Sequence, residues 1–244
     1  MIMKYTNYIF DLYGTLFDIL TDETGNGFRN SVSSFLTEKG AYYTPDGFIE
    51  RYLELCAEAQ LADPDPYFEL ELTDVFRRLY AEKGVEADPK LISETAVYFR
   101  KASTEKLELY PWVKPVFGMI RKAGGRIFLL SNAQACFTLP ELNELGIADD
   151  FDGIVISSDV SVKKPSPRIM RILLERFGLN VGESVMIGND QHSDIMTALS
   201  VGMDSLYIKT ATSGEYDPLI RASMELLDGD YKKIPEMLGL KRYV

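Results

Sequence analysis

The sequence contains very few of the residues on which several enzyme classes depend. Its 244 residues include a single histidine, His192, and only two cysteines. A zinc site built from several histidines is therefore excluded, and any Ser-His-Asp or Cys-His mechanism would have to use His192. The two cysteines, Cys56 and Cys136, are far apart in the chain, which is typical of free thiols in a reducing compartment.

Long apolar runs and an excess of positive charge are also missing. No stretch approaches the length of a membrane span, and the N-terminal residues lack the apolar segment of a signal peptide. We therefore expect a cytoplasmic protein with no membrane contact. The formal net charge is −11, so the surface should repel phosphate backbones, and nucleic acid is not an expected partner. Nothing in the sequence indicates an oligomeric state.

One apolar run that the chain does contain ends in a carboxylate. Tyr8-Ile9-Phe10 has the composition of a buried strand, and Asp11 follows at the end where open α/β sheets bind ligands. Gly14 permits a tight turn just after it. This pattern directs one carboxylate into a crevice, as a nucleophile requires, although an aspartate that merely caps a turn would give the same pattern.

The remainder of the chain divides into a helical part and an alternating part. From about Thr21 to Tyr110 apolar residues recur at helical spacing, and we expect about four helices and no strand. After residue 110 strands alternate with helices, which indicates parallel βαβ units. We predict an α/β fold with a Rossmann-like parallel sheet and helices on both faces, formed by residues 1–16 and 111–244. Residues 17–110 should form a small helical-bundle domain, and residues 219–227 and 234–238 should form closing helices.

Three further polar motifs follow in a fixed order. They are Ser131-Asn132, Lys164-Pro165, and Gly188-Asn189-Asp190 with Asp194. Together with Asp11, this order resembles the haloacid dehalogenase-like hydrolase superfamily over nearly the whole chain. The resemblance implies a hydrolase with an aspartate nucleophile. It also implies that the helical insert is a cap, which closes over the site and recognises the substrate.

The residue types suggest a role for each member of the site. Asp11 can attack carbon or phosphorus and form an intermediate that water then hydrolyses. Thr15 and Ser131 offer hydroxyl groups, although a serine such as Ser131 also fits a simple cap. Lys164 can balance the charge of the nucleophile and of an anionic transition state, with Lys163 as a one-residue alternative.

A small anionic substrate is the expected partner of this site. The residues predicted to bind it are Gly14, Ser131, Asn132 and Lys164. Five arginines of the helical insert are further candidates for binding an anion, although most arginines lie at the surface: Arg29, Arg51, Arg77, Arg78 and Arg100.

The resemblance also implies Mg²⁺ at the fourth motif. The predicted ligands are Asp11, the backbone carbonyl of Tyr13, Asp190, Asn189 and Asp194. The family often carries an aspartate directly after the glycine, where this chain has Asn189, so either Asn189 or Asp190 occupies the ligand position. Asp194 is a direct ligand, a neighbour of the ligands or a helix N-cap. Three carboxylates against one lysine favour a divalent cation.

Tyr13 separates two enzymatic interpretations. Phosphatases of the superfamily carry a second aspartate at this position as acid and base, and tyrosine, with an ordinary pKa near 10, is a poor substitute. The superfamily's 2-haloacid dehalogenases carry a tyrosine there and need no metal, because halide leaves without a proton. Against a dehalogenase, the fourth motif keeps two carboxylates, and the only tryptophan, Trp112, lies outside the helical insert.

Our prediction from the sequence is therefore an HAD-like hydrolase that hydrolyses a small phosphorylated metabolite with Mg²⁺. The first alternative is a metal-independent 2-haloacid dehalogenase. The second is a catalytically degenerate sensor of small anions, since a fold does not fix a function.

Overall fold

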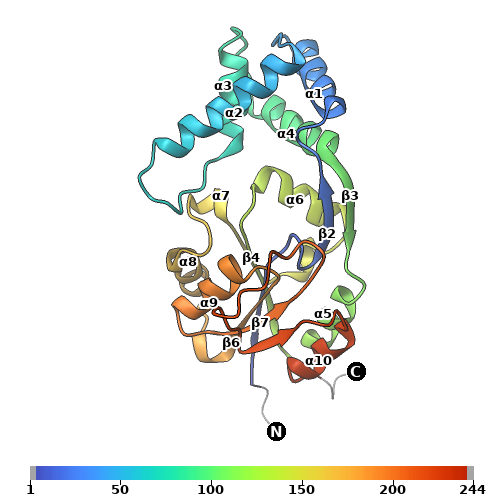
Figure 1. Ribbon diagram of the computed structural model, residues 1–244, viewed down its shortest axis with the longest axis vertical. Helices are drawn as coiled ribbons and strands as arrows, with labels where there is room; N and C mark the ends of the chain where they lie inside the picture. Colours follow the sequence, from blue (N-terminus) through green and yellow to red (C-terminus); the bar gives the residue numbers. More distant parts are fainter. Residues whose placement is uncertain (1–3, 241–244) are drawn as a thin grey trace.

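The computed structural model describes residues 4–240, which form two parts stacked along the long axis of the molecule (Figure 1). A sheet domain contains the first and last described residues. A helical lobe, which comprises α1 to α4, lies at the opposite end. Strands β2 (Phe17–Thr21) and β3 (Thr104–Leu109) run side by side between the two parts and carry the chain into and out of the lobe.

The sheet has six parallel strands in the order β5-β4-β1-β6-β7-β8. The strands are β1 (Asn7–Phe10), β4 (Arg126–Ser131), β5 (Gly153–Ile156), β6 (Ser184–Gly188), β7 (Asp204–Ile208) and β8 (Met224–Leu226). From β1 the chain builds the sheet outward through β4 and β5, and then crosses back to add β6, β7 and β8 on the other side. The direction of winding therefore changes between β1 and β6, which is where such sheets form a ligand crevice.

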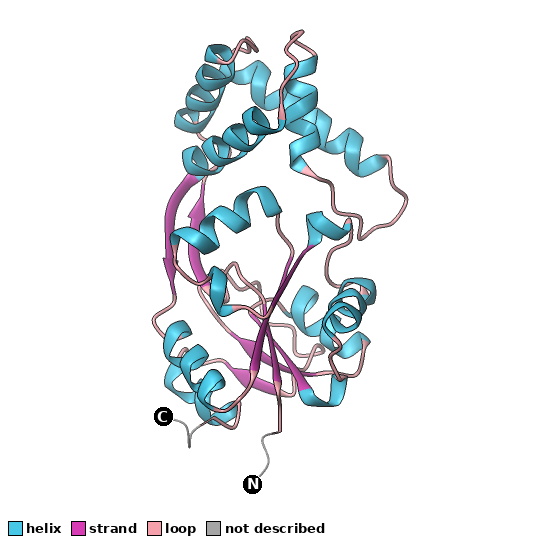
Figure 2. Cartoon of the chain, turned by 180° about the vertical axis from the view of Figure 1, so that it is seen from behind, coloured by secondary structure: helices cyan, strands magenta, loops and turns pink. Residues whose placement is uncertain are grey.

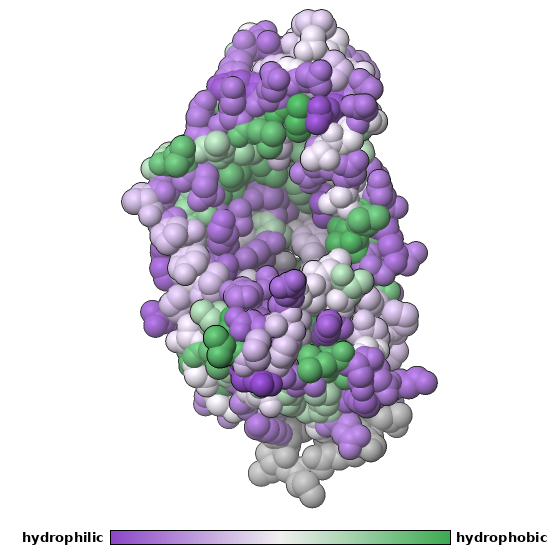
Figure 3. Space-filling view, in the orientation of Figure 1, coloured by the Kyte–Doolittle hydropathy of each residue, from purple (hydrophilic) through white to green (hydrophobic). Residues whose placement is uncertain are grey.

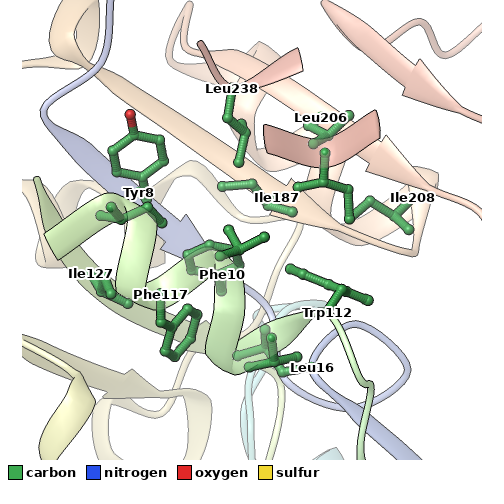
Figure 4. Close-up of a cluster of buried hydrophobic side chains, with 14 of the residues drawn as sticks. Tyr8, Phe10, Leu16, Trp112, Phe117, Ile127, Ile187, Leu206, Ile208 and Leu238 are labelled. Atoms are coloured by element: carbon green, nitrogen blue, oxygen red, sulfur yellow. The ribbon is translucent and has the colours of Figure 1, made fainter. Parts of the chain in front are cut away.

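Side chains of successive residues in β1 pack into two different hydrophobic cores, one on each face of the sheet. Tyr8 and Phe10 pack on one face with Phe117 of α5 (Val113–Lys122), as Figure 4 shows. Ile9 packs on the other face with Ile169 of α8 (Pro167–Phe177). Because side chains alternate along a strand, a strand buried on both faces is apolar throughout. The predicted α/β sheet with helices on both faces is therefore confirmed.

The other helices and turns of the sheet domain are short. The helices are α6 (Ala135–Glu144), α7 (Ser157–Val160), α9 (Met196–Ser200) and α10 (Ile234–Met237). The turns are η1 (Ala148–Asp150), η2 (Val181–Glu183), η4 (Tyr231–Lys233) and the π-helical η3 (Gln191–Ile195). Within residues 4–240, no helix has both the length and the apolar character that crossing a bilayer requires.

The helical lobe has an aromatic core of its own. Its helices are α1 (Asn26–Glu38), α2 (Pro45–Leu61), α3 (Leu72–Ala81) and α4 (Pro89–Ser103), grouped at one end of the molecule (Figure 2). Side chains of Thr44 and Asp88 accept backbone N–H groups at the starts of α2 and α4, as N-caps do. Phe99 of α4 stacks on Phe137 of α6, with ring centroids 5.8 Å apart, so the core of the lobe continues into the sheet domain.

Two predictions about secondary structure are wrong. Thr104–Leu109 is a strand, although no strand was expected from about Thr21 to Tyr110. Half-buried Leu107 and Leu109 flank the exposed Glu108, a pattern too short to distinguish from a helix end until β2 pairs with it. Residues 219–227 do not form a helix but include β8, whose three residues gain their backbone partners from β7. Pairing with a distant strand, and not local propensity, decides both segments.

Candidate active site

The candidate site lies at the carboxyl ends of β1 and β6. Asp11 follows β1, and its backbone N–H donates to the carbonyl of Ile187 in β6, 2.9 Å away. Asn189 and Asp190 follow β6 directly. A cavity of about 330 Å³ opens there, with Asp11, Lys164 and Asp190 in its wall. Figure 3 shows that the molecular surface is hollowed at mid-height, between the helical lobe and the sheet domain.

Both carboxylate oxygens of Asp11 are held by donors. Lys164 Nζ lies 2.7 Å from Oδ1, and the Ser131 hydroxyl donates to the same oxygen at 3.4 Å. The Thr15 hydroxyl donates to Oδ2 at 3.1 Å. Asp11 is only 7% exposed, so these three donors fix the direction of its carboxylate. The residues predicted from the first three motifs are thus brought together around one side chain.

Lys164 also binds a second carboxylate beneath the site. Its Nζ donates to Asp194 Oδ1 at 2.6 Å and to the Leu130 carbonyl at 2.9 Å, so all three ammonium donors have acceptors. Burial acts to lower the pKa of Lys164, but Asp11 and Asp194 raise it overall, and the side chain stays charged. Burial raises the pKa of Asp194, whose Oδ2 accepts the backbone N–H of Asp190 at 3.0 Å.

Asn132 holds the backbone of Lys164. Its amide oxygen accepts the Lys164 N–H at 2.7 Å, and its amide nitrogen donates to the Lys164 carbonyl at 3.0 Å. This pair of bonds selects Lys164 over Lys163 as the lysine that enters the site. The side-chain amide of Asn132, which was predicted to bind substrate, is therefore already bonded to the Lys164 backbone. Asn132 nevertheless lies in the cavity wall.

Asn189 connects the loop that follows β1 to a hydroxyl cluster after β7. Its amide oxygen lies 3.1 Å from the Thr15 hydroxyl, whose one proton is shared between this oxygen and Asp11. Its amide nitrogen donates to Thr210 and Thr212 at 3.2 Å each. A Cβ on Gly14 would lie 2.3 Å from Thr212 Oγ1, and Gly14 has φ +81°, so glycine is required there. The two threonines were missed from the sequence, although their position directly after a parallel strand could have indicated them.

The comparison with protein families agrees with this geometry. The model of the haloacid dehalogenase-like hydrolase family matches residues 5–202. The chain belongs to this family. As a haloacid dehalogenase-like hydrolase, it is an enzyme whose four motifs meet at one end of the sheet.

Curated relatives of this hydrolase include phosphatases. It is 28% identical over 197 residues to phosphoglycolate phosphatase of Yersinia pseudotuberculosis, which covers 79% of this chain and 76% of the relative. It is 26% identical over 203 residues to glyceraldehyde 3-phosphate phosphatase of Methanopyrus kandleri, which covers 80% of this chain and 86% of the relative.

Solved structures with the same fold include both kinds of enzyme that the sequence left open. The 2-haloacid dehalogenase from Pseudomonas syringae pv. Tomato DC3000 superposes with a TM-score of 0.69 and 22% identity, covering 98% of this chain and 100% of that one. An HAD phosphatase from Thermococcus onnurineus gives a TM-score of 0.61 and 21% identity over 96% and 98%. At these identities the likeness establishes the fold alone.

The side chain of Tyr13 in this HAD-like hydrolase is tied to groups outside the motifs. Its hydroxyl donates to Glu141 Oε2 at 2.5 Å and lies 3.0 Å from the Thr138 hydroxyl. Burial raises the pKa of Tyr13, and the charge of Glu141 raises it further. Arg100 of α4 donates to Glu141 Oε1 at 2.6 Å and lies over the Tyr13 ring, 5.2 Å from its centroid. Tyr13 therefore stays protonated. No motif or strand end in the sequence indicated Glu141.

Oxygen atoms that suit Mg²⁺ border the cavity. Asp11, Asn189 and Asp190 all lie in its wall, and Asp190 is exposed, with one oxygen capping η3 through the N–H groups of His192 and Ser193. Asp194 is fully buried and both its oxygens are already paired, so it acts on the site through Lys164.

The described chain offers no dense cluster of metal ligands. Residues 4–240 contain no group of three or more histidine, cysteine, aspartate or glutamate side chains arranged to hold a metal. Mg²⁺ keeps several waters and needs only one or two carboxylates, so the donor set at Asp11 and Asp190 fits a hydrated magnesium ion.

Proposed function

We propose that this protein is a Mg²⁺-dependent phosphatase that hydrolyses a small phosphorylated metabolite through an aspartyl-phosphate intermediate. The observation that carries the proposal is the fixed carboxylate of Asp11, held by Lys164, Ser131 and Thr15 beside the hard oxygen donors that follow β6. Its curated relatives include phosphatases for phosphoglycolate and glyceraldehyde 3-phosphate, which supports a substrate of that size.

In the first step, an Asp11 oxygen attacks phosphorus, and the bond between phosphorus and the ester oxygen breaks. The leaving alkoxide takes a proton from water, which becomes hydroxide, because Tyr13 is bound to Glu141 and its pKa is raised. In the second step, water attacks the aspartyl phosphate and gives its proton to that hydroxide. The bond between Asp11 and phosphorus breaks, which releases inorganic phosphate and restores Asp11. Lys164 stabilises the negative charge of both steps, and Asp194 keeps that lysine in place.

The metal would be held by Asp11, Asp190, the Tyr13 carbonyl and the Asn189 amide oxygen. When bound, Mg²⁺ would offset carboxylate charge that Lys164 leaves uncompensated and draw the oxygens of the phosphate towards the nucleophile. We further propose that the helical lobe acts as a cap, because Arg100 of α4 reaches a residue in the wall of the cavity.

A 2-haloacid dehalogenase is the second candidate, favoured by Tyr13 and by Asn189 at the position where the family often has a metal-binding aspartate. The deciding assay measures turnover of p-nitrophenyl phosphate and of L-2-chloropropionate, each with Mg²⁺ and with EDTA. We expect phosphate release that EDTA abolishes. Chloride release that is indifferent to EDTA, without ester cleavage, would replace the phosphatase by the dehalogenase. Binding of phosphate or haloacid without any turnover would indicate a sensor.

A further inference from the structure

The wall of the reaction cavity offers little positive charge to a substrate. Within the described chain, Lys164 is the only lysine or arginine in that wall. Its side chain is 1% exposed, and its ammonium group is already shared between Asp11 and Asp194. Asp190 adds an exposed carboxylate to the same wall. A bound phosphate would therefore be balanced by Lys164 and the metal. No positive side chain in the wall would remain to balance a second anionic group of the substrate.

The arginines of the helical lobe do not supply the missing charge. All five are paired with acids: Arg29 with Asp46, Arg51 with Glu54, Glu58 and Glu82, Arg77 with Asp74, Arg78 with Glu58, and Arg100 with Glu141. Near the cavity residue Ile19, Lys106 is likewise paired with Asp18. These six positive charges are thus already paired with acids before a substrate arrives.

Arg100 is the lobe arginine that touches the cavity wall. Its guanidinium lies over the ring of Tyr13, and Tyr13 lines the reaction cavity. Two acids compensate it: Glu141 at 2.6 Å and, more weakly, Glu23 at 4.0 Å. The side chains of Arg100 and Glu141 are 14% and 6% exposed, so water screens this pair little. Glu141 therefore decides whether the positive charge of Arg100 is felt in the cavity.

We propose that the site selects phosphate monoesters whose organic part carries no negative charge, and that Glu141 sets this selectivity by neutralising Arg100. The inference rests on the proposed phosphatase function and adds the charge class of the substrate. An uncompensated unit charge about 10 Å away, at an effective dielectric constant near 20, changes binding of an opposite charge by roughly tenfold. Selectivity of about that size is expected from this one pair.

The test compares two esters of equal length that differ at the far end. Glycerol 3-phosphate ends in a neutral hydroxymethyl group, and 3-phosphoglycerate ends in a carboxylate. For the native protein with Mg²⁺, we expect kcat/KM to be about tenfold higher for glycerol 3-phosphate, with the difference mainly in KM. The ratio should decrease as salt is added, because screening weakens the repulsion of the carboxylate.

Glu141→Gln removes the neutralising charge but keeps the size and an oxygen that can accept from Tyr13 or Arg100. We expect it to raise kcat/KM for 3-phosphoglycerate about tenfold relative to glycerol 3-phosphate. Combining it with Arg100→Met should restore the native ratio, since the freed charge is then gone. Glu58→Gln is the matched control. Glu58 also accepts from lobe arginines, Arg51 and Arg78, but among the described residues it forms no hydrogen bond with a residue of the cavity wall, whereas Glu141 accepts from Tyr13, so the ratio should not change.

The outcomes separate the inference from the function on which it rests. If p-nitrophenyl phosphate is hydrolysed but the native protein prefers 3-phosphoglycerate, or Glu141→Gln changes both esters equally, the charge selectivity is wrong and the phosphatase stands. If no phosphate ester is hydrolysed, the phosphatase fails and the selectivity with it. The native ratio and its salt dependence decide the question even if a variant proves unstable in thermal melts.

Discussion

The hydroxyl of Tyr13 and the carboxylate of Glu141, 128 positions apart in the chain, share a hydrogen bond of 2.5 Å. This bond directs the side chain of Tyr13 towards α6 and the helical lobe. In a phosphatase of this family, the residue two positions after the nucleophile would face the leaving group as an acid. Here Tyr13 is instead part of a contact between the lobe and the sheet domain. Under the proposed mechanism, water therefore supplies the proton to the leaving oxygen.

Replacing the nucleophile should abolish turnover without loss of the fold. In Asp11→Asn, the amide cannot form the acyl phosphate, so we expect turnover of p-nitrophenyl phosphate to fall at least about a thousandfold. Mass spectrometry of acid-quenched native protein should detect phosphate on the peptide that contains Asp11, and the variant should lack it. Circular dichroism and a thermal melt check the fold. Near-normal rates in the variant would favour direct attack by metal-activated water.

Restoring an acid at position 13 should increase phosphatase activity. Tyr13→Asp would provide a carboxyl group to protonate the leaving oxygen, a contribution of about a hundredfold for general acid catalysis. Alkyl phosphates should gain most and p-nitrophenyl phosphate least, because p-nitrophenolate leaves readily without a proton. Tyr13→Asn, which has the same size and no acid, is the control. An equal increase in activity in both variants would mean that loss of the tyrosine ring, and not the new carboxyl group, causes the increase.

Magnesium binding should depend on the exposed carboxylate of Asp190. We expect Asp190→Asn to raise the Kd for Mg²⁺ about tenfold by calorimetry, because one anionic ligand is lost. Ser193→Ala, in the same cavity wall, should leave the Kd nearly unchanged. Asn189→Asp should lower the Kd if that position is the ligand. An unchanged Kd in Asp190→Asn together with a lower one in Asn189→Asp would assign the metal position to residue 189.

The thiol of Cys136 should be unreactive in the folded protein. Burial raises the pKa of Cys136 to about 12, and burial also raises the pKa of Cys56. Because the thiolate is the nucleophile, a raised pKa lowers its fraction at pH 8, and alkylation by iodoacetamide should be at least about a hundredfold slower than in the unfolded chain. The rate for Cys136 should keep rising with pH beyond 9. Rapid alkylation of Cys136 in the folded protein at pH 8 would contradict the burial of its thiol.

Much of the site could be predicted because its residues follow strands. Asp11, Ser131 and Asn189 each stand directly after an apolar run, and parallel strands bring their carboxyl ends to one edge. Lys164 and Lys163 could not be separated from the sequence, because the choice is made by two hydrogen bonds from Asn132. The ribbon of β2 and β3 was missed because its strands are short and gain stability only from each other.

The sequence by itself determined the α/β class, the strands of the sheet from β1 to β7 and the polar residues that follow them, because periodicity and strand-end chemistry are local properties. Only the tertiary structure decided which charges are free. In the sequence, Glu141 is an ordinary acid on a predicted helix. In the structure it accepts hydrogen bonds from Arg100 of the lobe and from Tyr13, which follows β1. The charge of Asp194 is likewise paired with Lys164 inside the protein. Charge in a crevice is a sum over side chains that are distant in sequence, and only packing brings them within reach of one another.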